Sequence, residues 1–425
     1  MSLQRSLASR KDCSGEGQPL PLKVVLDICK STQQAAPSNF LFVVLPEGDS
    51  YTEGIYRYND KEFVLITDKG KTNYSMELYP ELVWDEQITL KELIRVGLSW
   101  QYLSLKVESL GLGVSQRARS PKKINKLINS HTTQNQILLY SVAVRKRDRG
   151  ALKEDKLTPL QKESEEGMFL LDTPDCYKDR AIYENRYEGV SIDSAIFNLV
   201  EKKPPNYSSL HELSQLLWAC QGETDHATHG NRDDLEKNGY GRVHASGCAG
   251  YSVYPIVFVD KLANIPKGGY WYNPVGFSAL NRWVRVNNNL KYDHYIQEFT
   301  TDYSKIQIEE ELGRKFSNYA ILLCIDRKKP CGAGFMHKVM NLKYWAEVEA
   351  GMALAGLQLQ ANALGLTWEK GILSNPDDDK YRSLFNLDFA EQSINNMAKK
   401  LANQAKNERL SLISNLVPVL LFYLK

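Results

Sequence analysis

The residues best suited to bind a ligand lie in a glycine-rich run that precedes an apolar stretch. The sequence GRVHASGCAGY (241–251) places Arg242 before a series of small residues, and YPIVFVD (254–260) follows. Small residues let backbone N–H groups approach a ligand closely, and an arginine offers a forked donor for a phosphate group. The run therefore indicates an anion-binding loop ahead of a strand, with a tight glycine-rich turn as the simpler alternative.

Histidine and cysteine residues in and near this run are the residue types of two other kinds of site, a zinc site and a nucleophile with its base. His226 and His229 stand three residues apart, and His244 and Cys248 stand four apart. A structural zinc site usually has four ligands in two recognisable pairs, a pattern that the sequence lacks, so we predict no metal site. Cys248 and His244 are also the residue types of a nucleophile and its base. Such a pair needs a hydrogen bond between the two side chains, and their closeness in sequence does not show one.

The chain contains an internal repeat. Two distant segments match without a gap, GLSWQYLSLKVESLGLG (97–113) and GMALAGLQLQANALGLT (351–367). In each, leucines at helical spacing lead to a Gly-Leu pair, where glycine suits a left-handed helix end. Both segments are therefore predicted to be buried helices that stop at this glycine.

Other segments repeat in the same order around these helices. They are the apolar strands 40–45 and 254–260, the tyrosine-rich strands 54–59 and 268–273, and the closing strands 136–142 and 418–424. This shared order indicates an internal duplication, with a chance similarity of apolar patterns as the alternative. The second half is longer and includes a further strand at 318–326.

Composition and charge suggest where the halves divide and which partners to exclude. A chain of 425 residues exceeds one typical domain, and the charged run 145–167 predicts a degenerate half at 1–150, a linker at 151–175 and a second domain at 176–425. A net charge of +2 provides no strong field for nucleic acid or a membrane surface, so neither is expected as a partner. Seven cysteines without a CxxC pair favour a reducing, cytoplasmic location, and the basic N-terminal start leaves an organellar one open.

The motifs of the second half together resemble a known flavoprotein family. In order, they are LSQLLWACQG (213–222), CAGYSVYPIVFV (248–259), GGYWYN (268–273) and EAGMALAGLQLQANALGLT (349–367). This series is similar to the nitroreductase-like flavoproteins, and most similar to the SagB-type dehydrogenases. The first half resembles the same family less closely. The resemblance implies an α+β, nitroreductase-like fold whose tandem duplication forms an intramolecular pseudo-dimer, with FMN bound between the halves.

The resemblance also implies which residues bind FMN. Ahead of the LSQLLWA helix, where the family has arginines for the flavin phosphate, this chain has EKKPPNY (201–207), and lysine can supply that charge. The matching segment of the first half, 31–45, has neither glycine nor arginine, so phosphate binding is expected in the second half alone. The expected FMN contacts are Lys202, Lys203 and Arg242 at the phosphate, Cys248, Ala249, Gly250 and Tyr251 around the ring, Gly365 and Leu366 at the helix end, and Gln34 and Ser38 from the first half.

Three residues ahead of the EAG motif are the predicted catalytic residues. Azoline oxidases of the resembled family carry a Lys-Tyr pair at the spacing where this chain has His337 and Lys338, and the pair that ends at Tyr344 is displaced toward the motif. This departure argues against azoline oxidation. His337, Lys338 and Tyr344 remain candidates for proton transfer.

We therefore predict an FMN-dependent oxidoreductase that acts on a small or peptide-derived substrate, with a reduced nicotinamide or oxygen as redox partner. A further homodimer is left open. The alternative is a nitroreductase fold that has lost flavin and serves as a scaffold or partner-binding protein, which the missing arginines favour.

Overall fold

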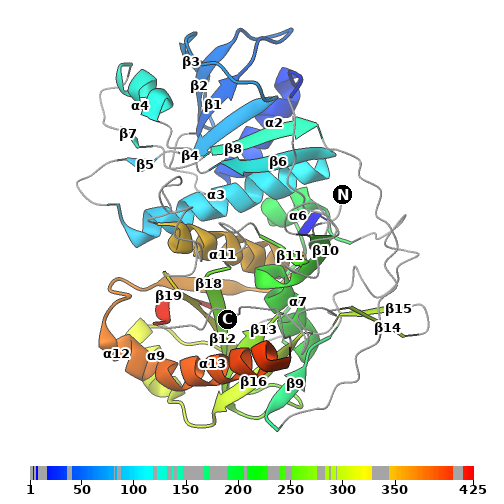
Figure 1. Cartoon of the computed structure of the whole chain (residues 1–425), viewed down its shortest axis with the longest axis vertical. Helices are drawn as coiled ribbons and strands as arrows, with labels where there is room; N and C mark the ends of the chain where they lie inside the picture. Colours follow the sequence, from blue (N-terminus) through cyan, green and yellow to red (C-terminus); the bar gives the residue numbers. More distant parts are fainter. Residues whose placement is uncertain are drawn as a thin grey trace.

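Two antiparallel sheets enclose a pair of long helices. The computed structural model of the chain describes Leu3, Ser6 and Leu7 and residues 17–35, 41–80, 82–83, 88–117, 122–131, 136–137, 141–146, 166–172, 189–204, 208–227, 240–244, 251–274, 283–286, 289–292, 294–327, 344–404 and 415–425. Figure 1 shows the helices α3 (Leu90–Ser109) and α11 (Trp345–Ala363) side by side between the two sheets. The centre of the molecule is thus formed by one helix from each half.

The first sheet belongs to the first half. Its strands, in spatial order, are β3 (Phe63–Thr67), β2 (Gly54–Tyr58), β1 (Leu41–Leu45), β4 (Met76–Pro80), β8 (Ser141–Lys146) and β6 (Leu112–Arg117). In β1, Val43 faces the core with α3 and Phe42 faces the cluster with α4 (Lys122–Asn129), so both faces of the sheet are covered. Burial on both faces explains why the strand is apolar without interruption.

The second sheet repeats this construction. Its strands, in spatial order, are β18 (Trp368–Ile372), β19 (Val417–Leu424), β17 (Tyr319–Ile325), β12 (Val253–Val259), β13 (Gly268–Asn273), β16 (Tyr295–Thr300) and β9 (Met168–Leu170). One face packs on α11, and the other packs on a layer formed by α9 (Lys305–Leu312), α12 (Asp379–Leu384) and α13 (Leu387–Gln404). The strand predicted at 318–326 is confirmed as β17.

The remaining elements are short or lie ahead of the sheets. Among the described residues they are the helices α2 (Leu22–Gln33), α6 (Ile192–Ile196) and α7 (Leu210–Gln221), and the strand pairs β5 (Leu82–Val83) with β7 (Gln136–Ile137), β10 (Glu223–Ala227) with β11 (Tyr240–Arg242), and β14 (Trp283–Val286) with β15 (Asn289–Tyr292).

The two halves share one topology. In each, three strands, a fourth strand, a long central helix and two more strands follow along the chain, and the six strands take the same spatial order. The second sheet adds β9, which lies inside the segment predicted as the linker. The predicted closing strand 136–142 is displaced, because the strand that pairs there is β8 at 141–146. This shared topology is what the predicted duplication requires, whereas the duplication and the domain boundaries stay predictions.

Both central helices end as predicted. Gly111 and Gly365, the glycines of the Gly-Leu pairs, have φ values of +73° and +70°. Only glycine adopts this left-handed conformation without strain, which is why each helix stops there. At its other end, α3 starts with a capping box in which Thr89 and Glu92 satisfy each other's backbone N–H groups.

The central helices cross at equivalent glycines. Gly97 and Gly351 occupy the same position in the sequence repeat. A Cβ atom at Gly97 would lie 2.0 Å from the carbonyl oxygen of Val348, and one at Gly351 would lie 2.2 Å from the carbonyl oxygen of Ile94. Each helix therefore contacts the other at the position three residues before its glycine. Such reciprocity is the pattern of a two-fold dimer interface, here within one chain.

We expect Gly97→Ala and Gly351→Ala each to lower the free energy of unfolding by about 1–3 kcal/mol, because a methyl group must push the helices apart. Urea denaturation of the full chain measures this change. Gly371→Ala is the control, since a Cβ there meets no atom within 4 Å. Wild-type stability in both helix variants would contradict the close crossing.

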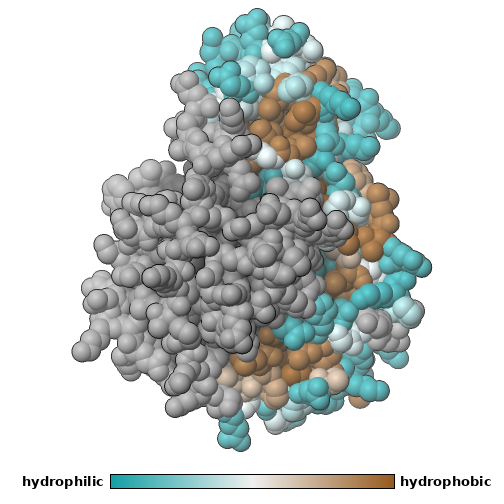
Figure 2. Space-filling model, turned by 90° about the vertical axis from the view of Figure 1, so that its right-hand side faces the viewer, coloured by the Kyte–Doolittle hydropathy of each residue, from teal (hydrophilic) through white to brown (hydrophobic). Residues whose placement is uncertain are grey.

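The described surface carries no single dominant apolar band. The exposed large hydrophobic residues include Leu199, Ile306 and Phe389, which come from different elements. On the face shown in Figure 2, the hydrophobic surface of the coloured residues lies in separate patches among hydrophilic ones. Scattered residues of this kind are normal for a protein surface. In the parts of the chain with assigned positions, no helix is both long and apolar enough to cross a bilayer.

Candidate functional site

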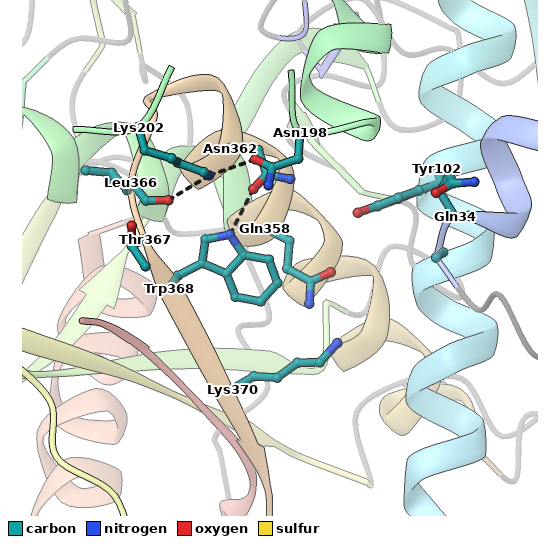
Figure 3. Close-up of a pocket in the computed structure, with 11 residues that line it drawn as sticks. Gln34, Tyr102, Asn198, Lys202, Gln358, Asn362, Leu366, Thr367, Trp368 and Lys370 are labelled. Carbon is teal, nitrogen blue, oxygen red and sulfur yellow. Dashed lines mark hydrogen bonds between the residues drawn. The ribbon is translucent and has the colours of Figure 1, made fainter. Parts of the chain in front are cut away.

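A cavity of about 510 Å³ lies at the seam between the two halves (Figure 3). Its volume is typical of sites for cofactors and other small molecules. Most of the lining comes from the second half, while the first half contributes the turn after α2 and one side chain of α3. The lining residues are Gln34, Ala35, Tyr102, Asn198, Lys202, Gln358, Asn362, Leu366, Thr367, Trp368 and Lys370.

The left-handed turn at the end of α11 positions the cation of this site. Gly365 N–H donates to the Asn362 carbonyl, and the Gly365 carbonyl accepts from Lys203 N–H at 2.8 Å. A Cβ at Gly365 would lie 2.3 Å from the Glu201 carbonyl oxygen, so only glycine permits this close approach of the two segments. The helix end thereby fixes the backbone on both sides of Lys202.

Lys202 is held in place by neutral acceptors. Its ammonium group donates to Asn198 Oδ1 at 2.7 Å and to the Leu366 carbonyl at 3.2 Å. Burial lowers the pKa of Lys202, because the charge is partly removed from water. Among the residues that the structure describes, no carboxylate pairs with it. The positive charge is thus available to an anion that enters the cavity.

Lys203 points to a different partner. Its ammonium group forms an ion pair with Glu212 of α7 at 2.9 Å, and Glu212 is 3% exposed. Lys203 does not line the cavity. Of the two lysines predicted to hold a phosphate group, the structure therefore brings only Lys202 to the cavity.

Fixed polar and aromatic groups form the central wall. Asn362 donates to the Ala195 carbonyl at 3.0 Å and accepts from Trp368 Nε1 at 3.0 Å. The Trp368 ring stacks on Phe422 with a centroid distance of 5.5 Å. These contacts hold the indole ring as a rigid platform beside the cavity.

Two side chains of the cavity, an amide and a lysine, have no hydrogen-bond acceptor or opposite charge to pair with among the described residues. Gln358 is 4% exposed, and its Nε2 atom has no hydrogen-bond partner in the described part of the chain. Lys370 lies on β18, where burial, and then the positive charge of Arg95 on α3, lower its pKa to about 8. Buried donors and cations without partners are costly, so both groups favour a ligand with acceptor atoms and negative charge.

The predicted residues Arg242 and Tyr251 lie elsewhere. The Arg242 guanidinium lies 4.5 Å from the Tyr251 ring centroid, and its backbone N–H donates to the Tyr251 hydroxyl at 3.1 Å. The next residue, Ser252, is bonded to Glu349 of α11. Glu349 precedes Asn362 by thirteen residues. A helix rises 1.5 Å per residue, so Glu349 lies about 20 Å along α11 from Asn362, and neither Arg242 nor Tyr251 lines the cavity.

The predicted set thus divides into three groups. Gln34, Lys202 and Leu366 line the cavity, and Gly365 adjoins it. Arg242 and Tyr251, together with Tyr344 just before α11, are near the far end of that helix. Apart from Lys203, which pairs with Glu212, the other predicted residues fall outside the described residues: Ser38, Cys248, Ala249, Gly250, His337 and Lys338.

The sequence also contained a signal for residues that we did not predict. Gln358 and Asn362 stand four residues apart in the predicted buried helix, so they share one face. Polar amides at such a spacing in a buried helix indicate a polar cavity. Tyr102, Trp368 and Lys370 carried no comparable pattern.

Comparison with known proteins identifies the fold. No protein-family model matches the chain, and no curated protein matches it. A solved protein of Anabaena variabilis, assigned as a nitroreductase, matches with a TM-score of 0.54 and 12% identity, over 99% of this chain and 86% of its own. This similarity spans both halves. It shows that the chain has an α+β, nitroreductase-like fold.

Two further solved structures match less closely. A Ralstonia eutropha protein, also assigned as a nitroreductase, has a TM-score of 0.32 and 15% identity, over 64% of this chain and 95% of its own. The E. coli microcin synthetase McbBCD complex has a TM-score of 0.29 and 13% identity, over 65% of this chain and 77% of the matched chain. These TM-scores are too low to support an argument.

Proposed function

We propose that this protein is an FMN-dependent oxidoreductase whose cofactor binds in the cavity between the halves. The observation that supports it most strongly is the meeting of Gln34 from the first half with Lys202 and Leu366 from the second. A flavin site between two halves of a dimer is what the sequence resemblance implies. In this chain, the same fold provides such a seam internally.

The residues present fit a phosphorylated flavin. Lys202 carries a charge without a carboxylate partner among the described residues, as a phosphate group requires. Gln358 offers a buried, unpaired donor, as the polar edge of the ring system requires. Trp368 and Tyr102 provide aromatic surface next to these groups. When bound, FMN supplies hydride or electron transfer.

The chain's own residues bind, orient and shield. Lys202 would hold the phosphate group, and the turn at Gly365 fixes the backbone on which Lys202 is carried. Gln358 and Asn362 would orient the ring edge from one face of α11, while Gln34 and Tyr102 close the seam from the first half and limit the access of water. We further propose a small or peptide-derived substrate, with a reduced nicotinamide or oxygen as redox partner, and a role related to that of the SagB-type dehydrogenases.

The proposal is tested on the purified full chain. We expect yellow protein that releases one FMN per chain on denaturation, or colourless protein that regains FMN when it is added. At a concentration one hundred times its dissociation constant, FMN should stabilise the fold by about 2.7 kcal/mol, measured as a thermal shift. Protein with no bound flavin and no shift would reject the proposal.

One observation favours the alternative of a scaffold without flavin. Of the three predicted phosphate-binding cations, Lys202 alone lines the cavity, because Lys203 pairs with Glu212 and Arg242 is not a lining residue. A scaffold would show no FMN shift but would retain a reproducible protein partner in a pull-down. The two outcomes are mutually exclusive on the flavin measurement.

A further inference from the structure

Lys370 is the second cation of the cavity. It lies on β18 opposite Phe422 of β19, and its side chain extends into the cavity. In Figure 3, Lys370 and Lys202 lie on opposite sides of the Trp368 ring. The two lysines therefore serve different parts of the same cavity.

Lys106 and Lys370 have different electrostatic surroundings. Lys106 of α3 is 3% exposed, and two carboxylates, Asp27 and Asp193, pair with it at 2.8 and 2.7 Å. Lys370 has the opposite surroundings, because its charged neighbour Arg95 is also a cation. Within the ranges that the structure describes, no carboxylate pairs with Lys370 or with Arg95. The compensation that Lys106 receives from the protein is missing at Lys370.

Gln358 supplies an independent observation at the same place. It is 96% buried, it lines the cavity, and its Nε2 donor lacks a partner among the described residues. Figure 3 shows its amide group on the side of the cavity from which Lys370 enters. The Lys370 ammonium group and the Gln358 amide thus both line the cavity, and no acceptor among the described residues pairs with either of them. An oxyanion would satisfy the ammonium group and one of the two N–H groups of the Gln358 amide, which leaves the other N–H group for the edge of the flavin ring.

We propose that Lys370 and Gln358 form an oxyanion subsite, and that the substrate is a molecule whose carboxylate or phosphate group binds there. The assignment of this group to the substrate rests on the proposed function, in which Lys202 holds the flavin phosphate. The subsite itself needs only the cavity. It narrows the substrate to anionic molecules and excludes neutral ones as good ligands.

The test compares matched ligands on the full chain, loaded with FMN where FMN binds. Benzoate and benzamide share size and shape and differ in charge. We expect wild type to bind benzoate at least about tenfold more tightly than benzamide, as one charge-assisted hydrogen bond allows. Lys370→Met and Lys370→Gln should lose this preference, Lys370→Arg should keep part of it, and Lys69→Met, at an exposed turn, should keep all of it.

A second pair of ligands identifies the source of the anion. FMN and riboflavin differ by the phosphate group alone, and we expect Lys370→Met to leave their affinity ratio unchanged. An equal preference for benzoate in wild type and Lys370→Met would overturn the subsite. A fall of the FMN to riboflavin ratio in Lys370→Met would show that Lys370 serves the cofactor, which overturns the substrate assignment. If no flavin binds but the benzoate preference depends on Lys370, the subsite stands and the proposed function fails.

Discussion

Lys202→Met is expected to weaken FMN binding by about 10- to 100-fold, because a charge-assisted hydrogen bond to a phosphate group contributes about 1.5–3 kcal/mol. Riboflavin, which lacks the phosphate, should bind the variant nearly as tightly as it binds wild type. The wild-type contacts of this lysine are the neutral oxygens of Asn198 and Leu366, so its loss strands no buried carboxylate. Fluorescence titration with both flavins measures the ratio directly.

Lys203→Met is the matched control for this experiment. Lys203, like Lys202, precedes α7, but it pairs with the buried Glu212. Its removal should lower the free energy of unfolding, while the ratio of FMN affinity to riboflavin affinity stays at the wild-type value. If this affinity ratio fell in Lys203→Met and stayed at the wild-type value in Lys202→Met, our assignment of the phosphate-binding lysine would be reversed.

Lys370→Met should stabilise the ligand-free protein at pH 7. The pKa of Lys370 in the fold is about 8, below its ordinary value of 10.5, because burial and Arg95 disfavour the charged form. Below pH 8 the folded state must carry this unfavourable charge. As the pH rises from about 8 to 10.5, the folded state is deprotonated and the unfolded state still binds the proton, so wild-type stability rises with pH.

Lys370→Met removes the free-energy cost of the charged side chain, and with it the rise of stability with pH. For a partly buried lysine, we expect a gain of roughly 1–3 kcal/mol in the free energy of unfolding at pH 7, which shrinks toward pH 10. Urea denaturation at pH 7, 8, 9 and 10 measures it, with Lys69→Met as the exposed control. An unchanged pH dependence in Lys370→Met would contradict the buried, uncompensated charge. A residue that costs stability and is nevertheless present suggests a role in binding.

Local patterns in the sequence predicted most of the fold. Leucines at helical spacing and the Gly-Leu pairs predicted α3 and α11 and their ends, and the glycines at 111 and 365 have the expected left-handed conformation. Continuous apolar runs predicted β1, β12 and β19, because strands covered on both faces need no polar residues. The predicted strand 136–142 was displaced to β8 at 141–146, since an apolar run does not fix which residues pair.

The site was harder to predict than the fold. Lys202 precedes α7 and Arg242 follows it. In the fold, however, Lys202 lies near the end of α11, whereas Arg242 lies near its start. A linear sequence does not show at which end of a helix two loops arrive. Lys370 was missed for a related reason, because its significance depends on Arg95 from the other half and on the absence of a described carboxylate beside it.

Hydrogen exchange of the full chain with and without FMN, followed by mass spectrometry, shows whether a flavin binds at the seam between the halves. We expect slower exchange in peptides from both halves, those that cover Gln34 and those that cover residues 358–370, and no change around Arg242. Protection confined to the Arg242–Tyr251 region, or in the second half alone, would contradict a flavin site at the seam.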